Sequence, residues 1–69
     1  MQMTPVSSSN LKAVGHENGV LRVEFLNGSV YDYHNVPHYI YNGLISAASH
    51  GGYLDQYVKK AGYNYTQIR

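Results

Sequence analysis

Apolar and charged side chains alternate in the middle of the chain, where Leu21, Val23 and Phe25 are separated by single charged residues. A period of two places these three side chains on one face of a β-strand. Asn-Gly pairs at 18–19 and 27–28 flank this segment, and Asn-Gly accepts the positive φ angles of tight hairpin turns. The pattern predicts a three-stranded antiparallel meander from about Leu11 to His34, with strands over residues 11–16, 21–25 and 29–34.

After Pro37 the apolar spacing changes to three and four residues, and Pro37 itself suits the first turn of a helix. The buried stripe of this first helix, from about Pro37 to Ala48, is Ile40, Tyr41, Leu44, Ile45 and Ala48. Residues 49–52 interrupt it, and a second, short helix follows with a stripe of Tyr53, Leu54, Tyr57, Val58 and Ala61. Gly62 is a fitting C-terminal stop for that helix. The tail, residues 63–69, alternates tyrosines with polar residues and permits an edge strand or an extended arm.

Strands followed by helices are typical of an α+β domain with helices on one face of an antiparallel sheet. We therefore predict a single domain over residues 1–69, with a three- to four-stranded antiparallel sheet, a meander, and two helices packed on one face. A chain of 69 residues buries only about 60% of its unfolded surface. We expect self-association, as a homodimer or a higher assembly, to add stability.

Composition narrows the class of protein. The chain has no cysteine, which excludes disulfides and thiolate metal sites and favours a cytoplasmic protein. Residues 1–5 have neither a basic start nor an apolar stretch, so we expect no targeting segment and no membrane partner. A net charge of +1 is far from the basic balance that binds long nucleic acid, so a small anion is the more natural partner.

Eight tyrosines are the most unusual feature of the composition. A tyrosine ring offers a stacking face and a polar tip, so several could hold a nucleotide base. We select Tyr31, Tyr33 and Tyr53 as the stacking candidates. For each tyrosine taken singly, a structural role is the favoured explanation: Tyr41 and Tyr57 lie on the helix stripes that form the core, and the others cover the sheet edge. Only the number of tyrosines favours a binding role.

The stretch Ser49-His50-Gly51-Gly52 precedes a predicted helix, where free backbone N–H groups and the helix dipole attract anions. We interpret it as a candidate phosphate cradle. The same residues are also typical of an ordinary turn between two helices. Ser8, Ser9 and Asn10 could donate to a ribose or phosphate, although such a tract often only starts a strand.

No arrangement of side chains indicates catalysis or a metal site. The chain has no Gly-X-Ser-X-Gly elbow, its four carboxylates are scattered, and the four histidines lack a spacing that would fix tetrahedral geometry. We therefore predict a protein that is not an enzyme, with no catalytic residues, no metal ligands and no cofactor. The default explanation of the basic residues Lys59, Lys60 and Arg69 is a solvated helix end, and these three residues could offset ligand phosphates if the tail folds back.

The order of short motifs resembles the KTSC family, small domains named for their occurrence at the C-terminus of some lysyl-tRNA synthetases. The motifs that carry this resemblance are Ser7-Ser8-Ser9-Asn10-Leu11, Val14-Gly15, Leu21-Arg22-Val23-Glu24-Phe25, Gly28, Tyr31-Asp32-Tyr33, Val36-Pro37, Leu44, Ser49-His50-Gly51-Gly52-Tyr53, Tyr63 and Tyr65. They cover nearly the whole chain. The chain departs from the family at His16, where an aromatic is expected, at His50, where lysine is common, and at Leu54, where phenylalanine is common.

The resemblance implies a stand-alone member of the kind frequent in phage and bacterial genomes, some of whose small phage counterparts hold nucleotide immune signals away from host effectors. By that analogy we predict a binder that sequesters an ADP-ribose-derived or cyclic nucleotide in the cytoplasm, the host cytoplasm if it is phage-encoded. The alternative is an accessory module for RNA or single-stranded nucleic acid. A protein-interaction module that binds no nucleotide is also left open. The predicted ligand-binding residues are Ser8, Ser9, Asn10, Tyr31, Tyr33, Ser49, His50, Gly51, Gly52, Tyr53 and Arg69.

Overall fold

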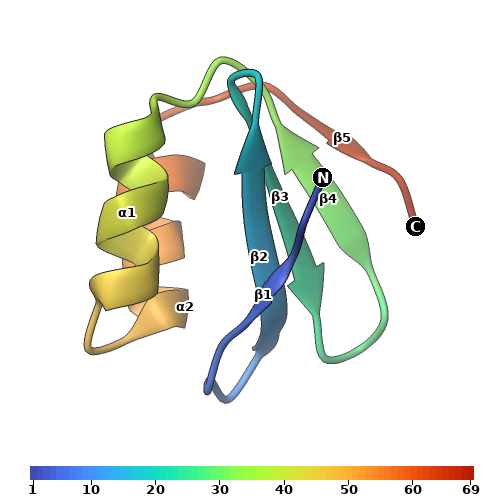
Figure 1. Ribbon diagram of the computed structural model, residues 1–69, viewed down its shortest axis with the longest axis vertical. Helices are drawn as coiled ribbons and strands as arrows, with labels where there is room; N and C mark the ends of the chain where they lie inside the picture. Colours follow the sequence, from blue (N-terminus) through green and yellow to red (C-terminus); the bar gives the residue numbers. More distant parts are fainter.

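A computed structural model describes residues 1–69 as a sheet with a helical layer on one side (Figure 1). The elements in chain order are β1 (Thr4–Pro5), β2 (Leu11–Glu17), β3 (Val20–Phe25), β4 (Val30–Tyr33), α1 (His38–Ser46), α2 (His50–Leu54), the π-helical turn η1 (Asp55–Lys59) and β5 (Tyr65–Gln67). The α+β class and the two helices on one face agree with the prediction. None of the helices is long and apolar enough to cross a lipid bilayer.

The sheet has five strands in the order β1-β2-β3-β4-β5, and every neighbouring pair is antiparallel. The meander of β2, β3 and β4 lies where the alternation predicted it. The tail forms β5 along β4, so the edge strand that the sequence permitted is the conformation found. The two-residue strand β1 was not predicted, and it raises the strand count above the three or four expected.

The two Asn-Gly turns differ in conformation. Asn18 and Gly19 both have positive φ angles, 53° and 79°, as a two-residue hairpin turn requires. In the second turn only Gly28 is left-handed, with φ of 93°. There the Asn27 side chain closes the loop instead, because its Oδ1 accepts from the Ser29 N–H at 3.0 Å and from the Ser29 hydroxyl at 2.7 Å.

The helix bounds differ from those expected. Pro37 precedes α1 with an extended ψ of 148°, and α1 ends at Ser46, two residues before the predicted end. The second helix begins earlier than predicted, because Ser49 is its cap and its Oγ accepts from the Gly52 N–H at 3.1 Å. Residues 50–52 are therefore the first turn of α2. Gly62, with φ of 86°, ends the helical segment as predicted.

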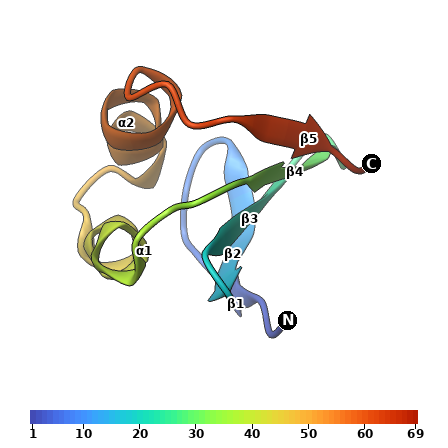
Figure 2. The same cartoon turned by 90° about the horizontal axis from the view of Figure 1, so that it is seen from above.

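The hydrophobic core lies between the two helices and one face of the sheet. Both helices lie on the same side of the strands, as Figure 2 shows from above. The ten core residues are Leu11, Val14, Leu21, Val23, Tyr33, Val36, Ile40, Leu44, Leu54 and Val58. A register shift between Leu11 and Ala13 lets Leu11 and Val14 both be buried, which explains the blurred alternation of this strand.

An ion pair lies on the opposite face of the sheet, where Arg22 is directly across from Asp32. The guanidinium Nε and Nη2 donate to the two carboxylate oxygens of Asp32 at 2.7 and 2.9 Å. These hydrogen bonds, aided by the guanidinium charge, lower the pKa of Asp32. Both oxygens of the nearly buried carboxylate thus accept hydrogen bonds, and the ion pair links β4 to β3 on the face of the sheet away from the helices.

Candidate functional site: a tyrosine-lined groove

A cluster of aromatic rings covers the part of the sheet formed by β4 and β5. The register pairs Val23 with Tyr31 and Tyr33 with Tyr65, which turns the three tyrosines toward the helical side of the sheet. The ring centroids of Tyr65 lie 5.7 Å from Tyr31 and 5.8 Å from Tyr33. The Phe25 ring meets Tyr31 edge to face, with centroids 5.7 Å apart. The result is a continuous aromatic surface on one side of the sheet.

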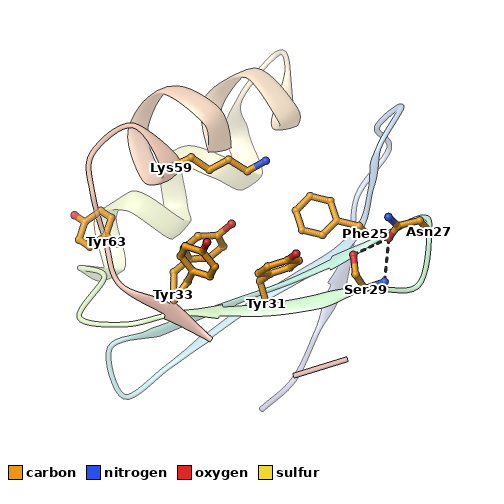
Figure 3. Close-up of a pocket in the computed structure, with 8 residues that line it drawn as sticks. Phe25, Asn27, Ser29, Tyr31, Tyr33, Lys59 and Tyr63 are labelled. Carbon is orange, nitrogen blue, oxygen red and sulfur yellow. Dashed lines mark hydrogen bonds between the residues drawn. The ribbon is translucent and has the colours of Figure 1, made fainter. Parts of the chain in front are cut away.

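The aromatic surface is the floor of a pocket of about 470 Å³. Its lining residues are Phe25, Asn27, Ser29, Tyr31, Tyr33, Lys59, Tyr63 and Tyr65. In Figure 3 the tyrosines of β4 point up from the sheet, while Lys59 reaches over from the helical layer. The volume falls in the range of about 300–1,000 Å³ that small-molecule sites occupy.

The pocket has one cation and no acidic side chain among its lining residues. Lys59 Nζ lies 5.4 Å from the centroid of the Phe25 ring, within reach of a cation–π contact. Lys59 is exposed, so its ammonium group can turn toward a bound anion. The local charge therefore favours a ligand that carries negative charge.

Burial changes the chemistry of one tyrosine on the floor. Tyr33 is 4% exposed, and this burial raises the pKa of its phenol, with smaller contributions from Tyr31 and Tyr65. The Tyr33 phenol therefore keeps its proton to a higher pH than an ordinary tyrosine does. Tyr65 is 62% exposed, so its ring is accessible from solvent.

A second pocket, of about 430 Å³, adjoins the first and shares Phe25, Asn27 and Lys59 with it. It extends past Leu26 to Ser9 and Asn10. We call the two pockets together the tyrosine-lined groove. The groove thus runs from an aromatic end at Tyr31, Tyr33 and Tyr65, under Lys59, to a polar end at Ser9 and Asn10.

Hydrogen bonds hold the polar end of the groove in place. The Ser8 hydroxyl donates to Asn10 Oδ1 at 3.1 Å and accepts from the Asn10 and Leu11 N–H groups, each at 3.3 Å. The Asn10 side chain lies against Gly51, where a Cβ would be 2.7 Å from Asn10 Oδ1. The serine tract and the glycine loop, two of the predicted binding segments, are therefore neighbours.

Within the predicted phosphate cradle, two side chains are engaged in helix capping. Ser49 Oγ caps α2, and the His50 Nδ1–H donates to the Leu44 carbonyl at 2.8 Å, near the C-terminal end of α1. His50 therefore turns toward α1, and α2 is only five residues long. None of residues 49–52 lines either pocket. The capping contacts favour the turn interpretation of this stretch.

The remaining two predicted residues lie away from the groove. Tyr53 packs over Gly43 of α1, and its ring centroid is 4.6 Å from that of Tyr57. Arg69 donates to Glu24 Oε2 at 2.8 Å and to the Gly28 carbonyl at 3.1 Å. It lines a different pocket, with Met3 and Arg22 among its neighbours. Of the predicted residues, Tyr31, Tyr33, Ser9 and Asn10 line the groove.

Seven groove residues were outside the predicted ligand-binding set: Phe25, Leu26, Asn27, Ser29, Lys59, Tyr63 and Tyr65. The alternation of tyrosines in the tail was a usable signal, because pairing the tail with β4 puts Tyr65 beside Tyr33. The charge of Lys59 suggested that it could offset ligand phosphates, but its place over the groove depends on how η1 packs against the sheet.

Comparisons with known proteins agree with the fold. A family model described as the KTSC domain matches residues 7–65. An uncharacterized protein of Stutzerimonas stutzeri is 34% identical over 70 residues, which cover 99% of each chain. A protein of Tsukamurella paurometabola is 34% identical over 83% of this chain and 88% of its own. The crystal structure of a KTSC domain protein from Yersinia pestis has a TM-score of 0.88 at 31% identity, covering 99% of this chain and 97% of that chain.

Proposed function

The chain belongs to the KTSC domain family, and from this premise and the tyrosine-lined groove we propose that it is a non-catalytic protein that binds a small nucleotide. The observation that carries the proposal is the combination, in one pocket, of four tyrosine rings and one phenylalanine ring with one lysine and no carboxylate. Aromatic faces suit a base, and a cation suits phosphate.

In the proposed mode of binding, the base stacks on the exposed face of Tyr65 or Tyr31, a contact worth about 1–3 kcal/mol. Lys59 then neutralises a phosphate midway along the groove. Asn27 and Ser29 lie beside it with amide and hydroxyl groups that can bind a ribose. Asn10 and Ser9 receive the distal polar part of the ligand, which favours an elongated nucleotide such as one derived from ADP-ribose.

Binding without turnover is the second part of the proposal. General acid–base catalysis needs a placed proton donor or acceptor, and the first pocket contains no carboxylate and no histidine. A protein of this kind acts by lowering the free concentration of its ligand. We therefore propose sequestration of a nucleotide signal, as the phage anti-defence analogy implies.

An accessory module for single-stranded RNA or DNA is the alternative, and the exposure of Tyr65 beside the sheet edge favours it, because such proteins stack successive bases on open aromatic rings. The dependence of binding affinity on salt concentration distinguishes the two functions. Each phosphate that a long polyanion contacts makes binding steeply weaker as salt rises, whereas a small ligand held mainly by stacking responds far less. One lysine in the groove and a net charge of +1 favour the small ligand.

Thermal-shift screening against ADP-ribose, cyclic mono- and dinucleotides and a short oligonucleotide tests the proposal. We expect a rise in the melting temperature with ADP-ribose or a cyclic nucleotide. Tyr65→Ala should abolish this rise. Tyr39→Ala, which removes an exposed tyrosine of α1 that lines neither pocket of the groove, should leave it unchanged. Shifts with the oligonucleotide alone would favour the alternative, and no shift with any probe would contradict both functions.

Self-association also remains a proposal. The exposed rings of Tyr39 and Tyr57 on the helical layer leave apolar surface that a second copy could cover. Size-exclusion chromatography with light scattering measures it directly. A clean monomer at a high micromolar concentration would contradict the proposal.

A further inference from the structure

Two histidine rings meet edge to face where the end of β2 lies against the start of α1. The Nδ1 atoms of His16 and His38 are 3.1 Å apart. The ring centroids are 5.0 Å apart, and the ring planes are inclined at 67°. The two residues lie 22 positions apart in the sequence, so only the folded chain brings them together. This pair is outside the tyrosine-lined groove.

A hydrogen bond from Nε2 of His16 fixes the tautomer of its ring. His16 Nε2 lies 2.7 Å from the Val36 carbonyl oxygen, which can only accept a hydrogen bond. Nε2 therefore carries the ring proton, and the neutral ring has its lone pair on Nδ1, aimed at His38. Histidines that bind metals typically donate their second N–H to a carbonyl or carboxylate in this way.

The separation of the two Nδ1 atoms fits a shared metal ion. Metal–nitrogen bonds to histidine are about 2.0–2.1 Å long, so bond angles from 90° to 109° place the two nitrogens about 2.8–3.4 Å apart. The observed 3.1 Å lies inside this range. We propose that His16 and His38 form a binding site for a divalent transition-metal ion, with both Nδ1 atoms as ligands.

Metal binding requires one proton to move. Without metal, the Nδ1–H of His38 donates to the Nδ1 lone pair of His16. To bind the ion, His38 must release the proton from Nδ1 and carry one on Nε2 instead. His38 is exposed, so water can take the proton from Nδ1 and supply one to Nε2, and the ring has the same charge before and after the exchange. Each ring then presents one lone pair to the ion.

The surroundings of the pair are ordered. The Tyr41 ring lies beside both histidines, with centroids 5.8 Å from His16 and 5.6 Å from His38. Its hydroxyl is 3.4 Å from the Thr4 hydroxyl of β1, so three segments meet around the pair. No group of three histidine or acidic side chains gathers in the chain, so water fills the remaining coordination positions. A site with two imidazoles and water suits Cu²⁺ best among the divalent first-row ions.

Calorimetric titration of the whole chain with Cu²⁺, compared with Zn²⁺ and Mg²⁺, tests the site. We expect one Cu²⁺ per chain, weaker binding of Zn²⁺ and none of Mg²⁺. His38→Ala should weaken Cu²⁺ binding at least tenfold. His34→Ala is the matched control, because the hydrogen bond of the His34 ring is to the Thr66 hydroxyl and not to another histidine, and this variant should change the affinity less than twofold.

His16 is better tested by spectroscopy than by substitution, because its ring also holds the Val36 carbonyl. In an NMR titration, the paramagnetic Cu²⁺ ion should broaden the ring signals of His16 and His38 first, ahead of His34 and His50. Copper binding that survives His38→Ala, or broadening that begins at the N-terminal amine or at another histidine, would overturn the proposal. Absence of Cu²⁺ binding would overturn it as well.

Discussion

The helical side of the sheet has two halves of different chemistry. On β2 and β3 the fully buried side chains that face the helices are aliphatic: Leu11, Val14, Leu21 and Val23. On β4 and β5 the corresponding positions are tyrosines, of which Tyr33 is buried while Tyr65 is largely exposed. We call β2 and β3 the covered half of the sheet, and β4 and β5 the open half. Both halves follow the same alternation along their strands. The alternation alone therefore does not decide the fate of a position on the helical side of the sheet. A position becomes part of the core where a helix packs over it, and it can form a site where no helix does.

The largest expected effect is in the covered half. Leu44 is fully buried between α1 and the sheet, and Leu44→Ala would leave a cavity in a small core. We expect the free energy of unfolding to fall by about 3 kcal/mol. Urea denaturation followed by circular dichroism measures the change. A loss below about 1 kcal/mol would mean that this half of the sheet is no better packed than the open half.

The ion pair between Arg22 and Asp32 supports the open half on the face of the sheet that points away from the helices, and Asp32→Asn tests this support. We expect a loss of about 1.5 kcal/mol in unfolding free energy, at the low end for charged hydrogen bonds because the Arg22 side chain is 35% exposed. The lowered pKa of Asp32 stabilises the fold at pH values above the ordinary 3.8, and this contribution is lost as the pH falls toward the folded-state pKa. Urea titrations between pH 2 and 6 should therefore show that the unfolding free energy of the variant depends less on pH than that of the parent. The same pH dependence in both proteins would contradict a stabilising ion pair.

Tyr65→Ala tests whether the open half binds rather than stabilises. The ring is 62% exposed, so we expect the unfolding free energy to change by less than about 1 kcal/mol. The affinity for the nucleotide found by screening should fall at least tenfold, or about 1.4 kcal/mol. Isothermal titration and urea denaturation of the same sample separate the two effects. A large loss of stability with unchanged affinity would reverse the assignment of the two halves.

Gly51→Asp tests whether the ligand phosphates lie in the groove or at the glycine loop, residues 49–52. A Cβ at this position would press on Asn10, so we expect a loss of affinity of about threefold, or about 0.7 kcal/mol, at the polar end of the groove. Gly51→Ala is the control, since it displaces Asn10 without adding a charge. A loss well over tenfold for the aspartate variant alone would locate the ligand phosphates at residues 49–52, as the sequence first suggested.

The smallest expected effect concerns Tyr33, which lies at the boundary between the halves. Its raised pKa means that the folded state prefers the neutral phenol, so its contribution to stability is complete below the ordinary value of 10.0 and declines as the pH rises above it. We expect Tyr33→Phe to lose less stability than the parent between pH 9 and 11. Thermal unfolding across this range, with Tyr57→Phe as the exposed control, measures the difference. Equal declines in the parent and the Tyr33 variant would show that burial of Tyr33 has no such effect.

Most of the fold could be predicted because its signals are local. The alternation around Val23, the Asn18-Gly19 turn and the helical spacing after Pro37 each act within a few residues. The strand β1 has only two residues, one of them a proline, and carries no periodic signal. The start of α2 was misjudged because two consecutive glycines suggest a break, whereas the Ser49 cap makes them helical.

The site was less predictable because it depends on tertiary packing. Tyr31 and Tyr33 could be placed on one face from the strand period alone. Lys59 reaches the groove only through the packing of η1 over the sheet, and Tyr65 only through the pairing of β5 with β4. The role of His50 was equally hidden, since its partner is the Leu44 carbonyl of the preceding helix.

Chemical-shift mapping during titration with ADP-ribose tests the central claim, that the open half of the sheet is a nucleotide site, most directly. We predict that the amide signals of Tyr31 and Tyr65 and the side-chain signals of Lys59 move first and saturate together, while those of the buried Leu21 and Val23 stay in place. Perturbations confined to residues 49–52 and Tyr53, or no perturbation with ADP-ribose or any cyclic nucleotide, would contradict the account.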